Sequence, residues 1–214
     1  MPKVRLGVLV SGGGTNLQAI IDSIQSGYLP ASIEVVLSNR EDSYALQRAA
    51  SNGIPNCAVL PKDFKTVQEY DEELISILKK FSVNLVILAG FVRVLSPVFV
   101  RAYPNRIMNI HPSLIPSFCG KGYYGLRVHK EVIRYGVKIT GATVHFVDEG
   151  TDTGPIILQR AVSVEDHDTP ETLAARVLKE EHRIYPEAIK LFAEGRLVIK
   201  GRRVHIIKAK EELE

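Results

Sequence analysis

Hydrophobic residues along this chain gather in short runs rich in valine, isoleucine and leucine, and these runs alternate with amphipathic helical patterns. In the first half, residues 6–10, 33–38, 85–89 and 106–109 are predicted to be strands. A strand, helix, strand order favours a parallel sheet with right-handed crossovers. The pattern therefore predicts an α/β fold, in which helices flank a mostly parallel sheet.

The pattern changes after residue 138. Residues 143–147 and 156–164 are predicted to be two strands joined by a loop, followed by a long helix over 169–193 and a hairpin across 197–207. Such elements add antiparallel strands toward the C-terminus. The charged residues 208–214 are expected to form a solvated tail. With no repeat and no linker, residues 1–214 are expected to form a single domain.

Local signals mark several helix starts, since a capping residue or a proline at the first helical position favours initiation. They are Thr66 with Glu69 three residues later, Ser96 before Pro97, and Thr169 before Pro170. A further helix over 16–25 is predicted directly after a glycine-rich turn.

Composition narrows the classes of function. The formal net charge is +3 with charges of both signs mixed along the chain, which favours small anionic ligands over nucleic acid. The two cysteines, Cys57 and Cys119, suggest neither a disulfide framework nor a zinc site, and fit a reducing, cytoplasmic setting. The first apolar run is too short for a signal peptide, and no run approaches the roughly 20 residues of a membrane span.

A glycine-rich turn follows the first predicted strand. Ser11, glycines 12–14, Thr15 and Asn16 lead into a helix, where backbone N–H groups and the helix dipole attract a phosphate. The spacing matches neither the dinucleotide fingerprint nor the P-loop. Three adjacent glycines favour anion binding, and a merely tight turn is the alternative.

The strongest polar cluster follows an apolar strand. If residues 109–111 are extended, Asn109 and His111 point to one side and Ile110 to the core. Ligands gather at the carboxyl ends of parallel strands. The acidic loop 148–155 could bring a carboxylate to the imidazole. The alternative is a hydrogen-bonded structural histidine, and His145 could equally support a ligand or face solvent.

Other reactive residues suggest no further chemistry. Ser113 and Cys119 lack a second base, so structural roles are expected for both. The remaining histidines have no ligand-like spacing, and no metal site is predicted. These histidines are His129, His167, His182 and His205.

Four segments in this order carry a family resemblance: 11–18 (SGGGTNLQ), 88–95 (LAGFVRVL), 109–113 (NIHPS) and 152–155 (DTGP). Together they resemble the phosphoribosylglycinamide formyltransferases, the folate-dependent glycinamide ribonucleotide transformylases. The resemblance covers about residues 3–200. The third segment marks the wider formyltransferase superfamily, and the first points to the glycinamide ribonucleotide branch.

This resemblance implies a Rossmann-like formyltransferase fold and a set of residue roles. Asn109, His111 and Asp152 match the catalytic residues. Residues expected at the substrate are Gly14, Thr15, Asn16 and Glu181. Residues expected at the folate cofactor are Val92, Arg93, Val94 and Leu95, together with Asn109.

The implied reaction transfers the formyl group of 10-formyltetrahydrofolate to the amine of glycinamide ribonucleotide, in purine biosynthesis and without a metal. Asn109 and His111 would stabilise an oxyanion, and Asp152 would favour the charged imidazole. The alternatives are a related folate-dependent formyltransferase, a formyltetrahydrofolate hydrolase, or a non-catalytic phosphate-binding module. The expected partners are small molecules, with neither nucleic acid nor membrane, and the expected assembly is a monomer or homodimer.

Overall fold

The computed structural model describes residues 4–208 and divides into two compact units. One unit runs up to Asn109 and the second starts at Ile110. Unit 1 and unit 2 are described separately below. The expectation that residues 1–214 form a single domain stays a prediction.

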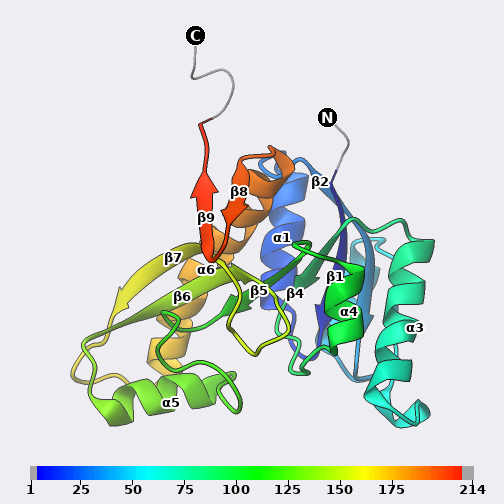
Figure 1. Cartoon of the computed structure of the whole chain (residues 1–214). Coiled ribbons are helices and arrows are strands. Elements are labelled where there is room, and N and C mark those ends of the chain that lie inside the picture. The colour runs from blue at the N-terminus through cyan, green and yellow to red at the C-terminus, as the bar shows by residue number, and fades with distance from the viewer. Residues whose placement is uncertain (1–3, 209–214) are drawn as a thin grey trace. The chain divides into compact units, whose positions relative to one another are not determined.

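Unit 1 contains a parallel sheet in the order β3-β2-β1-β4-β5, with helices in the connections (Figure 1). The strands are β1 (Val4–Val10), β2 (Ala31–Ser38), β3 (Asn56–Ala58), β4 (Leu85–Leu88) and β5 (Ile107–His111). The helices are α1 (Thr15–Gln25), α2 (Tyr44–Ser51), α3 (Val67–Lys80) and α4 (Pro97–Ala102), with a short 3-10 helix at Pro61–Asp63. Strand β5 ends at His111 and therefore contains the boundary between the units.

The central strands of unit 1 are buried on both faces. Leu6, Val8 and Leu9 of β1 have no exposed surface, and all four residues of β4 are buried. Parallel strands covered by helices read as continuous apolar runs, which explains why the sequence pattern located them well.

In unit 2, as described up to Lys208, the strands β6, β7, β9 and β8 pair in that order, and the helices α5 and α6 accompany them (Figure 1). Its elements are α5 (Leu126–Tyr135), β6 (Ile139–Phe146), β7 (Ile156–Ser163), α6 (Pro170–Ala193), β8 (Leu197–Lys200) and β9 (Arg203–Ile206). Strands β6 and β7 are antiparallel, as are β8 and β9, whereas β7 and β9 pair in parallel. Helix α6 packs against β6, β7 and α5.

The predicted fold class is confirmed, and the helix starts at positions 66, 96 and 169 are confirmed with it. The Thr66 side chain accepts a hydrogen bond from the backbone N–H of Glu69 at 3.1 Å. The Thr169 side chain caps α6 by accepting from the backbone N–H of Thr172. Helix α4 begins at Pro97, directly after Ser96.

The start of β6 and the presence of β3 differ from the prediction for a physical reason. Strand β6 begins at Ile139 rather than at residue 143, because Gly141 allows the backbone of Arg160 to approach where a Cβ would clash. Strand β3 was not predicted, since it has only three residues, none of them buried. Of the predicted tail, all except Lys208 lies outside the described residues.

Candidate active site

The three glycines of the glycine-rich turn in unit 1 differ in their surroundings: one packs closely against α2, and the other two have free space beside them. Gly14 has a φ of +70°, and a Cβ there would lie 2.6 Å from the Cβ of Ala45 in α2. A Cβ on Gly12 or Gly13 would meet nothing within 4 Å. The backbone at positions 12 and 13 is therefore accessible to a ligand, next to the N-terminus of α1.

Residues at the start of α2 and within it donate hydrogen bonds to the backbone carbonyls of this turn. The Ser43 hydroxyl donates to the Gly12 carbonyl at 2.9 Å, and the Ala45 N–H donates to the same oxygen at 3.0 Å. The Arg48 guanidinium donates to the Gly13 carbonyl at 2.8 Å. Because these carbonyls are engaged by α2, the turn has a fixed orientation at the N-terminus of α1, where the first N–H groups of a helix lack intrahelical partners.

The segment Val92–Leu95 connects β4 to α4 and alternates between exposed and covered side chains. Val92 and Val94 are 58% and 62% exposed, whereas Leu95 is buried. The Arg93 guanidinium lies over the Tyr70 ring, 5.1 Å from its centroid. This loop thus presents apolar side chains on its outer side, and its arginine is directed to α3.

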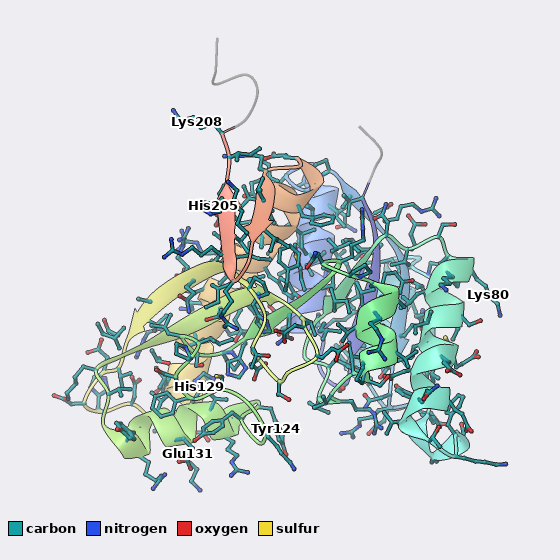
Figure 2. The ribbon with its side chains drawn as sticks, in the orientation of Figure 1. Lys80, Tyr124, His129, Glu131, His205 and Lys208 are labelled. Carbon is teal, nitrogen blue, oxygen red and sulfur yellow. The ribbon has the colours of Figure 1, made fainter. Side chains whose placement is uncertain are left out.

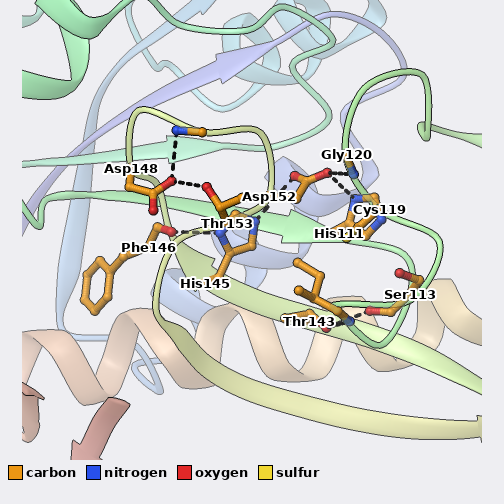
Figure 3. Close-up of polar contacts among 12 residues, drawn as sticks. His111, Ser113, Cys119, Gly120, Thr143, His145, Phe146, Asp148, Asp152 and Thr153 are labelled. Atoms are coloured by element: carbon orange, nitrogen blue, oxygen red, sulfur yellow. Dashed lines mark hydrogen bonds and ion pairs between the residues drawn. The ribbon is translucent and has the colours of Figure 1, made fainter. Parts of the chain in front are cut away.

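In unit 2, one carboxylate lies between two buried imidazoles (Figure 3). Asp152 Oδ2 is 3.6 Å from His111 Nδ1, and Asp152 Oδ1 is 3.7 Å from His145 Nε2. The Gly120 N–H donates to Asp152 Oδ2 at 2.8 Å. Asp152 has a φ of +57°, a left-handed conformation that aspartate tolerates better than most residues. The acidic loop therefore brings a carboxylate to the imidazole of His111, as the sequence suggested.

The outer nitrogen of each imidazole faces a backbone carbonyl. His111 Nε2 is 2.9 Å from the Phe118 oxygen, and His145 Nδ1 is 2.7 Å from the Phe146 oxygen. A carbonyl only accepts, so each of these nitrogens carries the hydrogen. The nitrogen that faces Asp152 can then donate only when its ring is an imidazolium. Both rings are thus oriented so that added charge meets the carboxylate.

Burial opposes that charge at two of the histidines of unit 2. It lowers the pKa of His145, and the charge of Asp152 partly offsets the effect. It also lowers the pKa of His129 on α5 to about 4, with a smaller contribution from charge on His111. Figure 2 labels His129 on this helix, and no described residue gives its Nδ1 a hydrogen bond. Near neutral pH, His129 and His145 are therefore held in the neutral form.

Comparison with known proteins assigns the family. The model of the formyl transferase family matches residues 4–189, which is most of the chain. The chain belongs to the formyl transferase family. The resemblance seen in the sequence motifs is thereby confirmed.

Solved and curated members of the formyl transferase family are similar over nearly the whole chain. Glycinamide ribonucleotide transformylase 1 from Symbiobacterium toebii is 50% identical, with a TM-score of 0.92, and the match covers 96% of this chain and 95% of that one. Phosphoribosylglycinamide formyltransferase from Escherichia coli is 42% identical over 89% of this chain and 87% of its own length. The chloroplastic enzyme of that name from Vigna unguiculata is 43% identical over 97% of this chain, which spans only 66% of that relative.

The other residues predicted for the site lie as follows. Asn109 lies in β5 two residues before His111, so the two side chains share one side of the strand, while Ile110 between them is buried. Thr15 is exposed at the start of α1, whereas Asn16 is buried. Glu181 lies on α6 and is 8% exposed. The roles of these residues stay predictions.

Ser113, in the 109–113 segment, and Cys119, in the loop that follows it, lie in environments that favour structural roles over nucleophilic ones. The Ser113 hydroxyl is fully buried and donates to the Ser117 carbonyl at 2.6 Å. Burial raises the pKa of the Cys119 thiol, and the nearby Asp152 charge adds to the effect, which disfavours a thiolate nucleophile. Among residues 4–208, no group of three or more histidine, cysteine or acidic residues is arranged to hold a metal ion. Within the same residues, no helix is long and apolar enough to cross a membrane.

Sequence reasoning left His145 undecided and missed His129. His145 is 1% exposed and faces Asp152, so it does not face solvent. Its alternation with two buried apolar neighbours, Val144 and Phe146, was the available signal. His129 carried no such signal, because its proximity to His111 depends on how α5 packs.

Proposed function

We propose that this chain transfers the formyl group of 10-formyltetrahydrofolate to the primary amine of glycinamide ribonucleotide. The products are formylglycinamide ribonucleotide and tetrahydrofolate, and the reaction belongs to de novo purine biosynthesis. The observation that carries the proposal is the carboxylate of Asp152 beside His111, at the end of the strand that also holds Asn109. The names of the similar bacterial and chloroplastic enzymes support the choice of acceptor.

In this proposal, unit 1 supplies the binding segments. The open backbone at Gly12 and Gly13, together with Thr15, suits a phosphate at the N-terminus of α1. The exposed valines at positions 92 and 94 suit a flat, largely apolar ring, and their backbone can hydrogen-bond its polar edge. The pterin ring of a folate has both properties. Glu181 is assigned to the ribose of the substrate.

The proposed chemistry needs no covalent intermediate on the protein. An α-amino group has an ordinary pKa of about 8, so a substantial fraction is neutral near pH 7 and needs positioning more than deprotonation. The amine nitrogen attacks the formyl carbon, and the C=O electron pair moves to the oxygen. Asn109 donates a hydrogen bond to this oxyanion. A protonated His111 donates a second one, for which its Nε2–H must turn away from the Phe118 carbonyl that it contacts at 2.9 Å.

Collapse of the tetrahedral species completes the transfer. The bond from the formyl carbon to the folate nitrogen breaks, and that nitrogen takes the proton of His111. The imidazole then regains a proton from the nitrogen that attacked, so that no net proton is gained or lost. The Asp152 carboxylate, 3.6 Å from the ring, attracts the positive charge that the ring carries in both steps.

The proposal extends to the cellular setting. Cys57 and Cys119 are both free thiols, which suits the reducing cytosol. We expect the enzyme to act there on small molecules, as a monomer or homodimer.

A side-by-side acceptor assay tests the function. The purified full chain is mixed with 10-formyltetrahydrofolate and with glycinamide ribonucleotide, methionyl-tRNA, or water alone, and tetrahydrofolate release is followed together with the formylated product. Turnover that requires glycinamide ribonucleotide supports the proposal. Equal release without any acceptor would identify a hydrolase, and an absence of turnover with all three would contradict catalysis of this kind.

A further inference from the structure

Ser11 lies between the two segments of unit 1 to which ligands are assigned. It follows the last residue of β1, directly precedes the glycine-rich turn, and is 5% exposed. Its hydroxyl oxygen accepts a hydrogen bond from the backbone N–H of Val92 at 3.0 Å, across 81 positions of the sequence. The Ser11 side chain, next to the glycine-rich turn, thus fixes the backbone of the segment Val92–Leu95, which is proposed to bind the cofactor.

The far end of the same segment has its own attachment. Asp71 on α3 is 2% exposed, and its Oδ2 accepts the backbone N–H of Ser96 at 2.6 Å. Between the two attachments, the Arg93 guanidinium lies over the Tyr70 ring. Val92 and Val94, between these two attachments, are exposed. Of these contacts, the bond from Ser11 is the one made by the turn that is assigned to the phosphate.

We propose that Ser11 is a positioning residue for the folate cofactor, which acts by fixing the backbone at Val92. This role rests on the proposed function. A hydroxyl at position 11 pairs the Val92 N–H, whereas a methyl group of similar size would leave that N–H without its partner. A loop freed at this point must be ordered again when the cofactor binds, so affinity for the cofactor falls. The phosphate turn itself keeps its bonds to α2.

The test measures the two ligands separately on the full chain. Ser11→Ala should weaken the Kd for tetrahydrofolate about tenfold, equivalent to about 1.4 kcal/mol, and leave the Kd for glycinamide ribonucleotide within about twofold. In turnover, the KM for 10-formyltetrahydrofolate should rise while kcat changes by less than about threefold. Ser11→Thr, which keeps the hydroxyl, should restore folate affinity.

A matched control is Ser43→Ala. Ser43 is also buried, but its hydroxyl donates to the Gly12 carbonyl in the glycine turn. We expect this variant to weaken glycinamide ribonucleotide and to spare tetrahydrofolate, which is the reverse of Ser11→Ala. General loosening of unit 1 would instead weaken both ligands in both variants, and that result would overturn the positioning role.

Hydrogen exchange gives a measurement that needs no variant. The Val92 amide should exchange slowly in the wild-type chain, although it lies in an exposed loop, and fast exchange would contradict the hydrogen bond to Ser11.

The binding measurements distinguish a failure of this role from a failure of the proposed function. If the wild type binds tetrahydrofolate and Ser11→Ala binds it equally well, the positioning role alone is wrong. If the wild type binds no tetrahydrofolate, the proposed function itself is wrong, and the role of Ser11 is overturned with it.

Discussion

Replacing Asp152 with asparagine removes one negative charge from the centre of the imidazole pair. The asparagine amide oxygen can still accept the Gly120 N–H, so the loop keeps its anchor. What is lost is the attraction between the carboxylate and an imidazolium at His111, whose Nδ1 lies 3.6 Å from Oδ2. At an effective dielectric constant of about 20, two unit charges at this separation attract by about 4 to 5 kcal/mol.

That energy sets the expected size of the effect. If most of it favours the charged donor in the transition state, the chemical step should slow by about 10³-fold, within the range of 10² to 10⁴ that a positioned acid or base contributes. Affinity for both substrates should change much less.

Single-turnover kinetics near pH 7 provide the assay, since product release cannot mask the chemical step in a single turnover. Asp148→Asn is the matched control, because Asp148 lies in the same loop and accepts from the Gly150 N–H and the Thr153 hydroxyl. We expect only a small change in that variant. An Asp152→Asn enzyme with the wild-type rate of the chemical step would show that Asp152 is structural.

Three further predictions concern stability. Gly14→Ala should lower the free energy of unfolding by at least about 1 to 2 kcal/mol, because residue 14 has positive φ and no room for a Cβ, whereas Gly13→Ala should be close to neutral in urea titrations. The pKa of His129 is lowered from 6.5 to about 4 in the folded chain. Between these two pH values the unfolded chain binds a proton at His129 and the folded chain does not. The free energy of unfolding should therefore fall by up to about 3 kcal/mol as the pH falls from 6.5 to 4. His129→Gln should remove that part of the pH dependence, whereas the same change at the exposed His205 should not. Thr169→Ala should cost about 1 kcal/mol through loss of the α6 cap, and an unchanged unfolding midpoint would contradict the capping contact.

The features that the sequence predicted are those with a local cause. Apolar runs buried on both faces gave the parallel strands, and Thr66 and Thr169 marked their helices because a capping side chain bonds to a backbone group three residues away. The antiparallel pair β6 and β7 was placed within a few residues. The start of β6 was missed, since the close approach at Gly141 depends on the partner strand.

The site divides in the same way. Asn109 and His111 could be paired from strand periodicity, and the 148–155 loop could be matched to the imidazole by its acidic residues. The second imidazole was not assigned. The alternation of His145 with Val144 and Phe146 separates it from their face of the strand, but it does not show that the ring lies beside Asp152 or that its Nδ1 contacts the Phe146 carbonyl. These contacts are set by tertiary packing, as are the burial of His129 and the bond from Ser11.

The close approach of Gly14 to Ala45 links two positions that no helix or strand shares. A larger residue at position 45 would press on the backbone of the turn, and any side chain at position 14 would press on α2. Among related sequences, positions 14 and 45 should therefore vary together. A residue larger than alanine at position 45 should occur only where the backbone of the turn has a different conformation. An engineer who wishes to accept a bulkier substrate beside the turn would gain little from enlarging the space at Gly12 or Gly13, which is already open. Substitutions at positions 14 and 45 would instead change the distance between the glycine-rich turn and α2.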